Sequence, residues 1–563
     1  MKFSEFKYEH LDEEYLKQNY EQALTKLKAC DNATDFMKEF KALNAFRGHM
    51  SSMITICSIR HTINTVDEYY DAENNYWDNV MPIMQEYETE MSRILLECPF
   101  KNELDIPETY FKMAEFQMKS FSPEIIEDLQ EENKLASEYG KLKASAKIEF
   151  NGEVYNLASI KPLMSSDDRQ VRKDAYKAYT KFYEDNEDKF DDIYDKLVKV
   201  RDRIAKKLGF KNFVELGYIR MNRLDYDAKM VENYRNQVIK DIVPITLKLR
   251  DRQARRIGLE KLECYDTGYK FKTGNPKPHG SIEELTKSAL TMYQEMSKET
   301  GEYFKMMVDQ ELFDLPTREN KEMGGYCTSI YDYQVPFIFA NSNGTQDDVD
   351  TLTHEAGHGF QAYCSMKNID NPDMIWSTME TAEINSMSME FFAHPWSHLF
   401  FKEDTEKYHY FHIESALEFL PYGCLVDHFQ HEVYENPQMS KEERKQTWRR
   451  LEKIYKPDSN YDGFDILEKG GYFYQQGHIF QSPFYYIDYT LAQVVALQFY
   501  VRMLNSDENA WKDYVYICGL GGTKSFTEQV KLANLKVPFE DGCLQEVAKK
   551  MEEELDKIED SKL

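Results

Sequence analysis

Apolar residues recur at intervals of three and four along the first 145 residues, with acidic and basic residues between them. One such stripe consists of Tyr15, Leu16, Tyr20, Ala23, Leu24 and Leu27. This spacing places the apolar side chains on one face of a helix. Because few turn residues interrupt the region, we expect long antiparallel helices whose charged faces are solvated.

Turn and capping signals divide the next part of the chain. The segment Ile148–Tyr155 has two alternating stretches around Asn151-Gly152, the pair most typical of a tight β-hairpin. Ser165–Asp168 has the composition of a helix N-cap, and the helical pattern after it ends at Gly209. We therefore expect a hairpin followed by a long helical run.

The composition changes between Gly324 and Asn343, where aromatic and β-branched residues predict strands. Pro336 cannot donate a hydrogen bond to a neighbouring strand, so it indicates an edge strand. The free backbone groups of an edge strand can pair with an extended peptide, which makes Gly325 and Tyr326 candidates for substrate binding. The alternative is an ordinary short sheet without a ligand.

The helix expected at Val349–Tyr363 contains the sequence His-Glu-Ala-Gly-His. His354 and His358 are four residues apart, so their imidazoles lie one turn apart on the same face and can bind one metal ion. Glu355 lies beside that ion without having to bind it. This arrangement is typical of zinc metallopeptidases. Gly357 costs about 1 kcal/mol relative to alanine in a helix, which indicates that another element packs closely against the backbone there.

A catalytic zinc ion usually has three protein ligands and a water molecule, so the motif lacks one ligand. The segment Trp376–Glu390 has the pattern of a second helix, with Glu380, Glu383 and Glu390 at positions i, i+3 and i+10. These carboxylates share one helical face and would repel one another without a cation or a proton. The segment therefore favours a metal site, but spacing alone does not decide which carboxylate binds.

The two segments together resemble the thimet oligopeptidase and oligoendopeptidase F family of zinc peptidases. Glu383 follows His358 by 25 residues (383 minus 358) and Glu390 follows Glu383 by seven, which matches the spacing of that family's glutamate ligand and of the glutamate after it. The resemblance implies that His354, His358 and Glu383 bind zinc and that Glu390 orients these ligands. Glu380, on the same face, is a second candidate for the orienting role.

The resemblance extends along most of the chain. Matching stretches are Phe337–Thr345, Asp427–Gln430 and His478–Gln493, and the likeness is closest to the Pz-peptidase branch. One departure is Gln361-Ala362 after the histidine motif, where many relatives carry another histidine. That histidine is not needed as a ligand, so the implied activity is unaffected.

Peptide hydrolysis also needs a base and a donor for the developing oxyanion. Glu355 is the expected base, which activates a zinc-bound water. In the family, a histidine followed by paired tyrosines binds the scissile carbonyl and the substrate backbone. This role carries over to His478, Tyr486 and Tyr489, and Tyr485 is a further substrate-binding candidate. The glycine-rich segment Gly470–His478 is expected to be a mobile loop.

Other motifs are weaker candidates for chemistry. His394 and His398 are also four residues apart, but Pro395 lies between them and no acidic residue follows the first histidine. We expect two further histidine pairs to be core or surface residues bonded to nearby carboxylates, namely His409 with His412 and His428 with His431. Gly519–Ser525 lacks the glycine before lysine that a phosphate-binding loop requires, so a plain loop is expected.

Composition excludes several classes of partner. Lys and Arg number 70 against 99 Asp and Glu, and a formal net charge of -29 disfavours nucleic acid and anionic membranes. The nine cysteines are odd in number and scattered, which favours free thiols in a reducing compartment. The first residues lack the apolar core of a signal peptide, and no stretch has the roughly 20 apolar residues of a membrane span. We therefore expect a cytoplasmic protein.

The chain of 563 residues is long enough for two or more cores. The resemblance implies a mainly α-helical, two-lobed zincin with a deep central channel and a small β-sheet beside the histidine helix. We expect a helical N-terminal lobe over residues 1–200 and a catalytic region over residues 201–563. The expected activity is hydrolysis of internal bonds in short, unfolded peptides with one Zn²⁺ per chain. The alternatives are a non-catalytic zinc-containing peptide-binding protein and a metallopeptidase that acts on folded proteins, and the sequence leaves the oligomeric state open.

Overall fold

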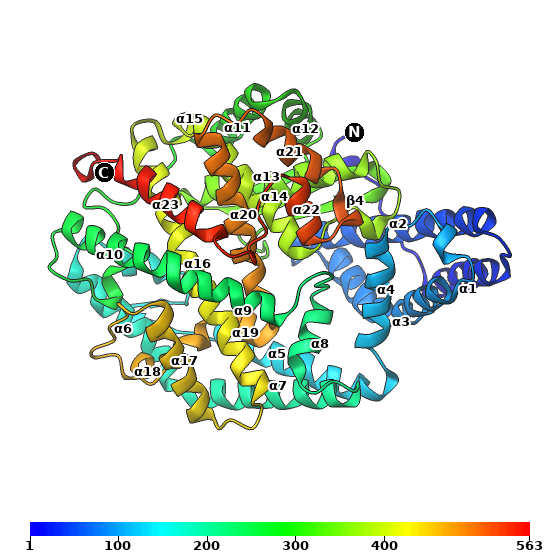
Figure 1. Cartoon of the computed structure of the whole chain (residues 1–563), viewed down its shortest axis with the longest axis horizontal. Helices are drawn as coiled ribbons and strands as arrows, with labels where there is room; N and C mark the ends of the chain where they lie inside the picture. Colours follow the sequence, from blue (N-terminus) through cyan, green and yellow to red (C-terminus); the bar gives the residue numbers. More distant parts are fainter. The chain divides into compact units, whose positions relative to one another are not determined.

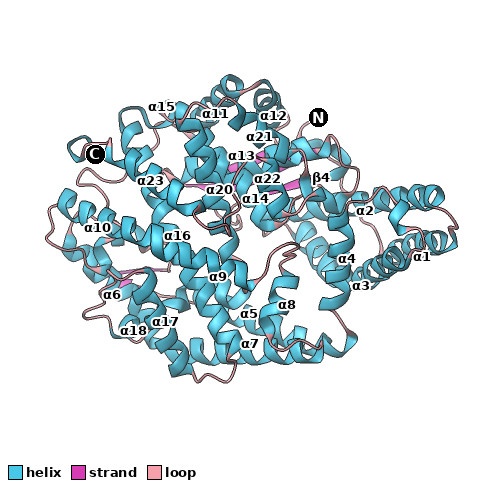
Figure 2. Cartoon of the chain, in the orientation of Figure 1, coloured by secondary structure: helices cyan, strands magenta, loops and turns pink.

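Helices form most of the regular structure, and strands form two small sheets (Figure 1 and Figure 2). The computed structural model describes residues 1–81 and 83–563. Contacts within the chain divide it into two units, each assembled from three segments. Unit 1 comprises Met1–Met118, Pro276–Thr405 and Val495–Lys536, and unit 2 comprises Lys119–Asn275, Glu406–Val494 and Val537–Leu563. The mainly α-helical fold is confirmed, whereas the boundary expected between residues 200 and 201 falls inside unit 2.

Unit 1 begins with the long helices that the apolar spacing predicts. They are α1 (Glu13–Ala29), α2 (Ala33–Ile63), α3 (Glu68–Glu97) and α4 (Glu108–Ser120). The side chains of Asp12, Asn32 and Asp67 accept hydrogen bonds from backbone N–H groups in the first turns of α1, α2 and α3. These caps satisfy donors that a helix start leaves without partners. All three helices contact one another and lie side by side in Figure 1.

Unit 1 also contains a three-stranded sheet in the order β3-β5-β4. Its strands are β3 (Phe313–Pro316), β4 (Tyr326–Ile330) and β5 (Val335–Ser342), with β3 parallel and β4 antiparallel to β5. The strands are confirmed, but the assignment of the Pro336 strand to an edge is wrong, because β5 is central. Pairing of β5 with β3 starts only at Ile338, so no acceptor on that side requires an N–H from Pro336. The edge strands are β3 and β4.

The remaining helices of unit 1 precede or follow the three strands along the chain. They are α11 (Ile282–Met296), α12 (Lys298–Asp309), α13 (Asp347–Met366), α14 (Met379–Phe392), α15 (His398–Phe401), α21 (Asn509–Cys518) and α22 (Phe526–Leu532). Helix α13 contacts α12, α14, α21 and the strands β4 and β5. The small sheet expected beside the histidine helix is therefore confirmed. The expected channel between two lobes stays a prediction.

Unit 2 is built mainly from helices. They are α5 (Ile126–Ala144), α6 (Arg169–Asp185), α7 (Glu187–Lys207), α8 (Phe213–Arg220), α9 (Ala228–Gln237), α10 (Val243–Ile257), α16 (Thr405–Glu435), α17 (Lys441–Tyr455), α18 (Asp465–Glu468), α19 (Gly477–Gln481) and α23 (Cys543–Asp556). Helix α20 (Tyr486–Leu504) contributes to both units, because the boundary between Val494 and Val495 lies within it.

The expected hairpin is confirmed as β1 (Ile148–Phe150) paired antiparallel with β2 (Glu153–Tyr155). Asn151 and Gly152 have φ angles of 51° and 85°, the left-handed conformations that a two-residue hairpin turn requires. The N-cap expected within Ser165–Asp168 lies at the last of these residues, Asp168, which caps α6, and the helical run breaks at Asn186 before α7. Helix α8, which begins after the capping residue Asn212, was not expected from the sequence pattern.

Buried side chains hold the start of α20 in unit 2. Phe484 has a left-handed backbone with φ 67°, which is uncommon for a bulky residue. Its N–H donates to Oε1 of Gln430 at 2.9 Å, and its carbonyl oxygen accepts from Arg223. Arg223 also donates to Asp488 at 2.9 Å, and both of these side chains are fully buried. The backbone just before Tyr485 and Tyr486 is therefore fixed by the core.

The segment Gly470–His478 is not the loop expected from its glycines. It forms a 3₁₀-helix (Gly471–Gln475) followed by the first residues of α19, and Phe473 and Tyr474 are buried. Gly470 has φ 102°, and a β-carbon there would lie 2.0 Å from the carbonyl oxygen of Lys445. The glycine is therefore required because the backbone of Lys445 lies so close, and it does not mark a loop.

The cysteines and the hydropathy of the helices agree with two further expectations. All nine cysteines are free thiols, as their scattered positions predict. Five of them are buried, the usual environment of a structural cysteine. Within the described part of the chain, the helices lack any stretch that combines the length and apolar character needed to span a bilayer.

Candidate active site

The histidine motif lies on α13, whose start is fixed by Asp348. The carboxylate of Asp348 accepts hydrogen bonds from the backbone N–H groups of Asn343 at 2.9 Å and Gly344 at 2.7 Å. Three acidic residues occupy the first turn, where they interact favourably with the positive end of the helix dipole. The predicted helix is confirmed, and the turn before it sets the position at which α13 begins.

Gly357 brings α13 and α14 into backbone contact. A β-carbon built on Gly357 would lie 2.6 Å from the carbonyl oxygen of Asn385 and 2.7 Å from Cα of Ser386. Only glycine allows this approach, so the close packing inferred from the sequence is confirmed. The contact places the part of α14 that carries Glu383 opposite the two histidines of α13.

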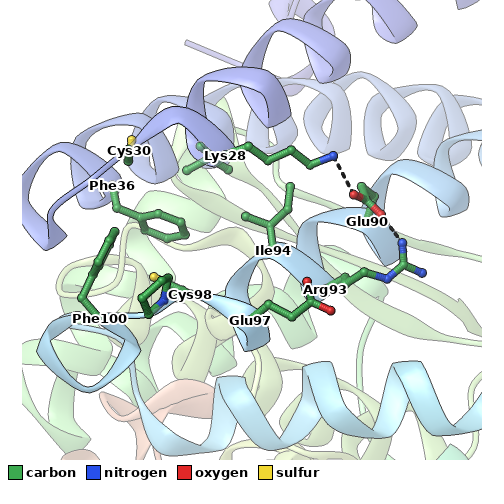
Figure 3. A pocket seen from close by; sticks show the side chains of 11 residues that line it. Lys28, Cys30, Phe36, Glu90, Arg93, Ile94, Glu97, Cys98 and Phe100 are labelled. Atoms are coloured by element: carbon green, nitrogen blue, oxygen red, sulfur yellow. Dashed lines mark hydrogen bonds and ion pairs between the residues drawn. The ribbon is translucent and has the colours of Figure 1, made fainter.

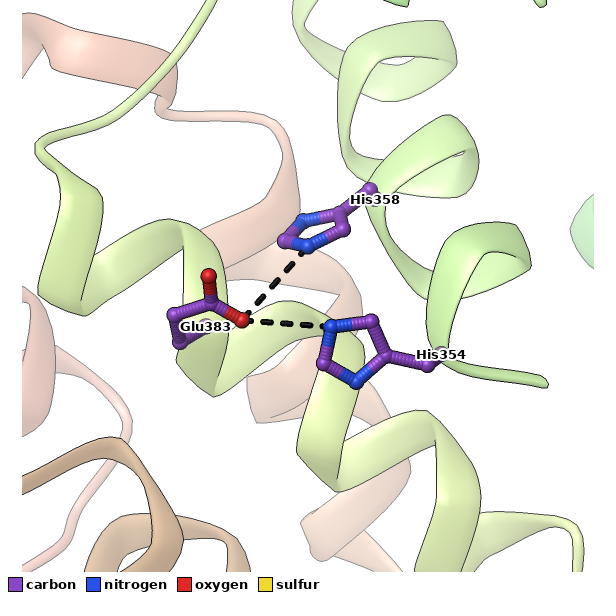
Figure 4. Close-up of side chains that lie close together, drawn as sticks. All are labelled: His354, His358 and Glu383. Carbon is purple, nitrogen blue, oxygen red and sulfur yellow. Dashed lines mark ion pairs between the residues drawn. The ribbon is translucent and has the colours of Figure 1, made fainter. Parts of the chain in front are cut away.

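Three predicted metal ligands converge in unit 1 (Figure 4). Nε2 of His354 lies 3.3 Å from Oε2 of Glu383, and Nε2 of His358 lies 3.6 Å from the same oxygen. One ligand atom from each residue falls within 4.8 Å of the other two. Two imidazole nitrogens and one carboxylate oxygen are the donor set of a catalytic zinc site, so these residues fit that metal.

Neighbouring polar groups form hydrogen bonds with His354 and Glu383 of this cluster. Nδ1 of His354 lies 2.7 Å from Oε1 of Glu390, which leaves Nε2 facing Glu383. The hydroxyl of Ser386 donates to Oε2 of Glu383 at 3.0 Å. Glu380 is buried on the same helix but is not part of the three-residue cluster. The structure thus separates Glu383, a member of the His-His-Glu cluster, from Glu390, which lies beside His354 of that cluster.

Burial and charge shift the protonation of this cluster. Burial opposes ionisation of Glu383, but the charges of His358 and His354 and their hydrogen bonds hold its pKa well below the ordinary value. Burial alone would lower the pKa of His354, yet its hydrogen bonds with Glu383 and Glu390 raise it well above the ordinary value. The site therefore favours a positive charge next to an ionised carboxylate, which is also what a bound cation requires.

Glu355 lies on α13 beside the His-His-Glu cluster without belonging to it. Its side chain is only 8% exposed, and burial raises its pKa above the ordinary value. A β-carbon built on Gly325 would lie 3.6 Å from Oε1 of Glu355. The backbone just before β4 therefore passes next to this carboxylate. A carboxyl group with a raised pKa can accept a proton and return it near neutral pH.

Tyr326, the first residue of β4, follows Gly325, and its side chain makes contacts within unit 1. The ring of Tyr326 stacks on Phe339 with centroids 4.8 Å apart, and its hydroxyl forms a 2.7 Å hydrogen bond with that of Thr62. These contacts commit the side chain of Tyr326 to unit 1 itself. What β4 offers to a ligand is therefore its backbone, as expected for an edge strand.

The other predicted residues gather in unit 2. The ring of His478 lies near the rings of Tyr485, Tyr486 and Tyr489, with centroid separations of 5.7, 4.8 and 6.0 Å. His478 comes from α19, and Tyr486 and Tyr489 lie one turn apart on α20. Burial raises the pKa of Tyr486, so its hydroxyl keeps its proton and can donate a hydrogen bond.

Some residues that form hydrogen bonds with the predicted site residues were not identified from the sequence. Gln476, whose Nε2 lies 2.7 Å from Nδ1 of His478, is a polar residue in a segment interpreted as a loop. Ser386 follows Glu383 by three residues on one helix, a spacing that could have revealed the contact. The composition of Asn343–Asp348 predicts a turn with capping residues before α13, but which N–H groups Asp348 binds depends on the folded turn.

The rival histidines have neighbours of their own. His431 is buried and forms a 2.9 Å hydrogen bond with the hydroxyl of Tyr218, and it lies 3.4 Å from Asp427. His428 contacts the hydroxyl of Tyr455 at 3.1 Å. His354, His358 and Glu383 are the only His, Cys, Asp and Glu group of this kind over residues 1–81 and 83–563. These contacts agree with the prediction that His428 and His431 are histidines bonded to nearby groups rather than metal ligands.

A pocket in unit 1 lies among α1, α2 and the end of α3 (Figure 3). It has a volume of about 260 Å³ and is lined by apolar side chains such as Phe36 and Ile94 and by charged ones. Glu90 pairs there with Lys28 at 2.8 Å and also with Arg93. None of the predicted site residues lines this pocket.

Comparison with known proteins gives the chain relatives over its full length. Residues 162–549 match the model of Peptidase family M3, and residues 3–121 match the Peptidase M3 N-terminal domain. A structure of Pz peptidase A with an inhibitor is 51% identical, covers 99% of this chain and 100% of its own, and has a TM-score of 0.92. Oligoendopeptidase-F from Enterococcus faecium, at 16% identity and a TM-score of 0.62 over 97% of this chain and 98% of its own, shares the fold.

Among curated proteins, an oligoendopeptidase F homolog of Borreliella burgdorferi is 24% identical over 375 residues. That match spans 64% of this chain and 61% of the relative, so the chain covers less than two thirds of it. The family model, by contrast, spans more than half of the chain and includes both segments that carry the His-His-Glu cluster. The chain belongs to Peptidase family M3.

Proposed function

We propose that this chain is a zinc metalloendopeptidase that hydrolyses internal bonds of short, unfolded peptides. The observation that carries the proposal is the convergence of His354, His358 and Glu383 beside the buried carboxylate of Glu355. Membership of Peptidase family M3 and the names of the relatives, Pz peptidase A and oligoendopeptidase F, support the same reaction and substrate class.

His354, His358 and Glu383 would hold one zinc ion per chain, oriented through Glu390. When bound, zinc supplies a Lewis acid that polarises a carbonyl and makes water more acidic. Glu355, whose pKa is raised by burial, takes a proton from the attacking water and later gives it to the leaving amine. A carboxylate whose pKa is raised by burial is a stronger base than an exposed one, which suits it to both transfers.

Two sets of donors would bind the substrate. The backbone of β4 near Gly325 pairs with an extended peptide, because β4 is an edge strand and this segment lies next to Glu355. His478, Tyr486 and Tyr489 donate hydrogen bonds to the scissile carbonyl oxygen as negative charge develops on it, and Tyr485 contacts the peptide. Support for the second set is the cluster these side chains form in unit 2 and the resemblance of their sequence to oligoendopeptidase F.

The substitution Glu355→Gln tests the mechanism. It removes the base and keeps the shape, so we expect zinc content to remain near one per chain while peptide hydrolysis falls by several orders of magnitude. Zinc is measured by atomic absorption and hydrolysis by mass spectrometry of a peptide mixture, with and without a chelator. Glu403→Gln, at an exposed glutamate of unit 1, is the control for the loss of one charge. Hydrolysis retained in Glu355→Gln would rule the mechanism out.

Two alternatives are distinguishable. A non-catalytic zinc protein would hold its metal with four protein ligands, whereas the described residues supply a cluster of three. Such a protein would bind peptides without cleaving them. A peptidase for folded proteins would degrade a stable folded domain as readily as short peptides, and we expect cleavage of the peptides only.

A further inference from the structure

His478 can donate a hydrogen bond from either ring nitrogen, and the partner of the other nitrogen decides which. The residue lies in α19 and is partly buried, with its ring packed against the tyrosines at the start of α20. His478 is one of the donors proposed for the scissile carbonyl, and its tautomer decides which ring nitrogen can donate that hydrogen bond. The contact that sets this tautomer comes from Gln476.

The side chain of Gln476 bridges two groups. Its Nε2 lies 2.7 Å from Nδ1 of His478, and its Oε1 accepts a 2.7 Å hydrogen bond from the hydroxyl of Tyr422 on α16. An amide nitrogen only donates, so Nδ1 of the imidazole must be the acceptor and the ring proton must lie on Nε2. With the amide reversed, the hydroxyl proton of Tyr422 would have no acceptor within the described residues. Tyr422 thus fixes the orientation of the Gln476 amide, and the amide fixes the tautomer of His478.

The charges around His478 favour the neutral ring. Burial and then the positive charge of Lys143 lower its pKa. Lys143 is held nearby because its Nζ donates to the carbonyl oxygen of Gln475 at 3.0 Å. Among the described residues, no carboxylate forms an ion pair with this histidine. The groups that face the ring are Lys143 of α5, Tyr485 just before α20, Tyr486 and Tyr489 of α20 and, through Gln476, Tyr422 of α16.

We propose that Tyr422 and Gln476 form a hydrogen-bonded chain that holds His478 as the neutral tautomer protonated on Nε2. Gln476 is then a positioning residue for the reaction, since it acts on the substrate only through His478. This inference rests on the proposed function, because the value of a fixed Nε2–H lies in the hydrogen bond it offers to the scissile carbonyl. The three residues all belong to unit 2.

The tautomer can be measured without any assay of activity. In protein labelled with ¹⁵N-histidine, the imidazole shifts of His478 are assigned by their loss in His478→Ala. We expect the unmodified chain to show the Nε2–H tautomer at pH 7.5. Gln476→Glu places a carboxylate at Nδ1, which should protonate that nitrogen, and Gln475→Glu adds the same charge one residue away as the matched control. Nδ1–H in the unmodified chain, or shifts of His478 unchanged by Gln476→Glu, would overturn the chain of hydrogen bonds.

A second variant keeps the inference testable if the added charge disturbs folding. Tyr422→Phe removes one hydroxyl and frees the amide of Gln476 to adopt both orientations. We expect a mixture of the two tautomers of His478 in this variant. A single Nε2–H tautomer that persists in Tyr422→Phe would overturn the role of Tyr422.

Kinetics test whether the tautomer matters for the reaction. In Gln476→Glu we expect kcat to fall about 100-fold, with a smaller change in KM, because the donor acts on developing charge. Because a carboxylate favours the imidazolium, which again carries a proton on Nε2, the loss of kcat relative to the unmodified chain should be smaller at low pH than at pH 7.5. An unchanged kcat in a variant whose tautomer has switched would overturn the positioning role. If His478→Ala itself left kcat unchanged, the role proposed for His478 would fail, while the NMR result would still decide the tautomer.

Discussion

At the scale of single residues, Glu390 fixes which ring nitrogen of His354 faces Glu383 and the proposed metal site. The 2.7 Å contact between Nδ1 of His354 and Oε1 of Glu390 places the ring proton on Nδ1 and leaves Nε2 available. In Glu390→Gln the amide is a weaker acceptor and can rotate its nitrogen toward the ring. We expect the Kd for zinc to rise about 10- to 100-fold, measured by competition with a chromogenic chelator. An unchanged Kd, matching that of Glu403→Gln, would show that Glu390 has no such effect.

His431 makes the stability of unit 2 depend on pH. Burial lowers its pKa to about 3, whereas the same side chain in the unfolded protein titrates near its ordinary value of 6.5. As the pH falls below that value, the unfolded chain binds a proton that the folded chain does not. The stabilisation is therefore complete above about pH 6.5 and is lost as the pH falls toward 3.

Substitution of His431 tests this dependence. Between pH 7.5 and pH 5.0 the residue should cost the folded state about 2 kcal/mol. The free energy of unfolding, measured in urea, should decrease between pH 7.5 and pH 5.0 in both proteins. We expect this decrease to be about 2 kcal/mol smaller in His431→Gln than in the unmodified chain. The measurement uses metal-free protein, because loss of zinc at low pH would add its own effect. A variant with the same pH dependence as the unmodified chain would contradict the assignment.

The residues of the candidate site differ in how far the sequence could reveal them. His354, His358 and Glu355 follow from helical spacing, since four residues make one turn. Three carboxylates share a face of α14, so the choice of Glu383 needed the resemblance, and the structure separates them by their distances to the histidines. Gln476 gave no signal, because its role depends on a tyrosine that lies 54 positions away (476 minus 422).

At the scale of elements, the contact between α13 and α14 depends on Gly357. Alanine there would gain helix propensity, but its β-carbon would meet backbone atoms of Asn385 and Ser386 at less than 3 Å. Backbone cannot rotate away as a side chain can, so one helix must shift. We expect Gly357→Ala to lower the free energy of unfolding by about 1–3 kcal/mol and to weaken zinc binding, because α14 carries Glu383.

A matched substitution separates this packing effect from helix propensity. Gly140 lies inside α5, and a β-carbon there would meet only Nε2 of Gln481, at 3.6 Å. Gly140→Ala should therefore stabilise the protein by about 0.5–1 kcal/mol and leave zinc binding unchanged. Urea denaturation and chelator competition measure both variants. If Gly357→Ala were as stable as Gly140→Ala, the close contact of the two helices would not be required.

Elements were predictable where local signals agree with burial. The hairpin follows from Asn151-Gly152, and α6 follows from its cap at Asp168. Pro336 misled because its missing donor matters only where a strand is paired on that side, and pairing with β3 begins two residues later, at Ile338. Strand order is a property of the assembled sheet and could not be read from one strand.

At the scale of the whole molecule, neither unit is a continuous stretch of sequence. Each unit combines three segments, and α20 passes from one to the other between Val494 and Val495. A boundary drawn at residue 200 follows the change from helical sequence to motif-rich sequence. Contacts between distant segments decide the units, however, and no composition shift marks them. This is why the elements were easier to predict than the domain organisation.

The interleaved segments predict how fragments of the chain should behave. A fragment of residues 201–563 lacks Thr62, which bonds Tyr326 of β4, and Arg47, which pairs with Asp373 at 2.8 Å in unit 1. It also lacks Asp191, which in unit 2 accepts hydrogen bonds from Tyr474 at 2.6 Å and from Lys445 at 3.0 Å. Both units would therefore lose buried partners at once, and the groups left behind would be costly to bury unpaired.

We expect the fragment of residues 201–563 to lack the near-UV circular dichroism of a packed protein and to bind zinc far more weakly than the full chain, although it contains His354, His358 and Glu383. Adding the fragment of residues 1–200 should restore both signals, because it supplies the missing helices of each unit without a covalent link. The full chain, nicked between residues 200 and 201 after folding, is the control and should keep its zinc. A fragment of residues 201–563 that unfolds cooperatively and binds zinc like the full chain would instead make the catalytic region an independent domain, and the division of the chain near residue 200 would then describe its folding better than the contacts do.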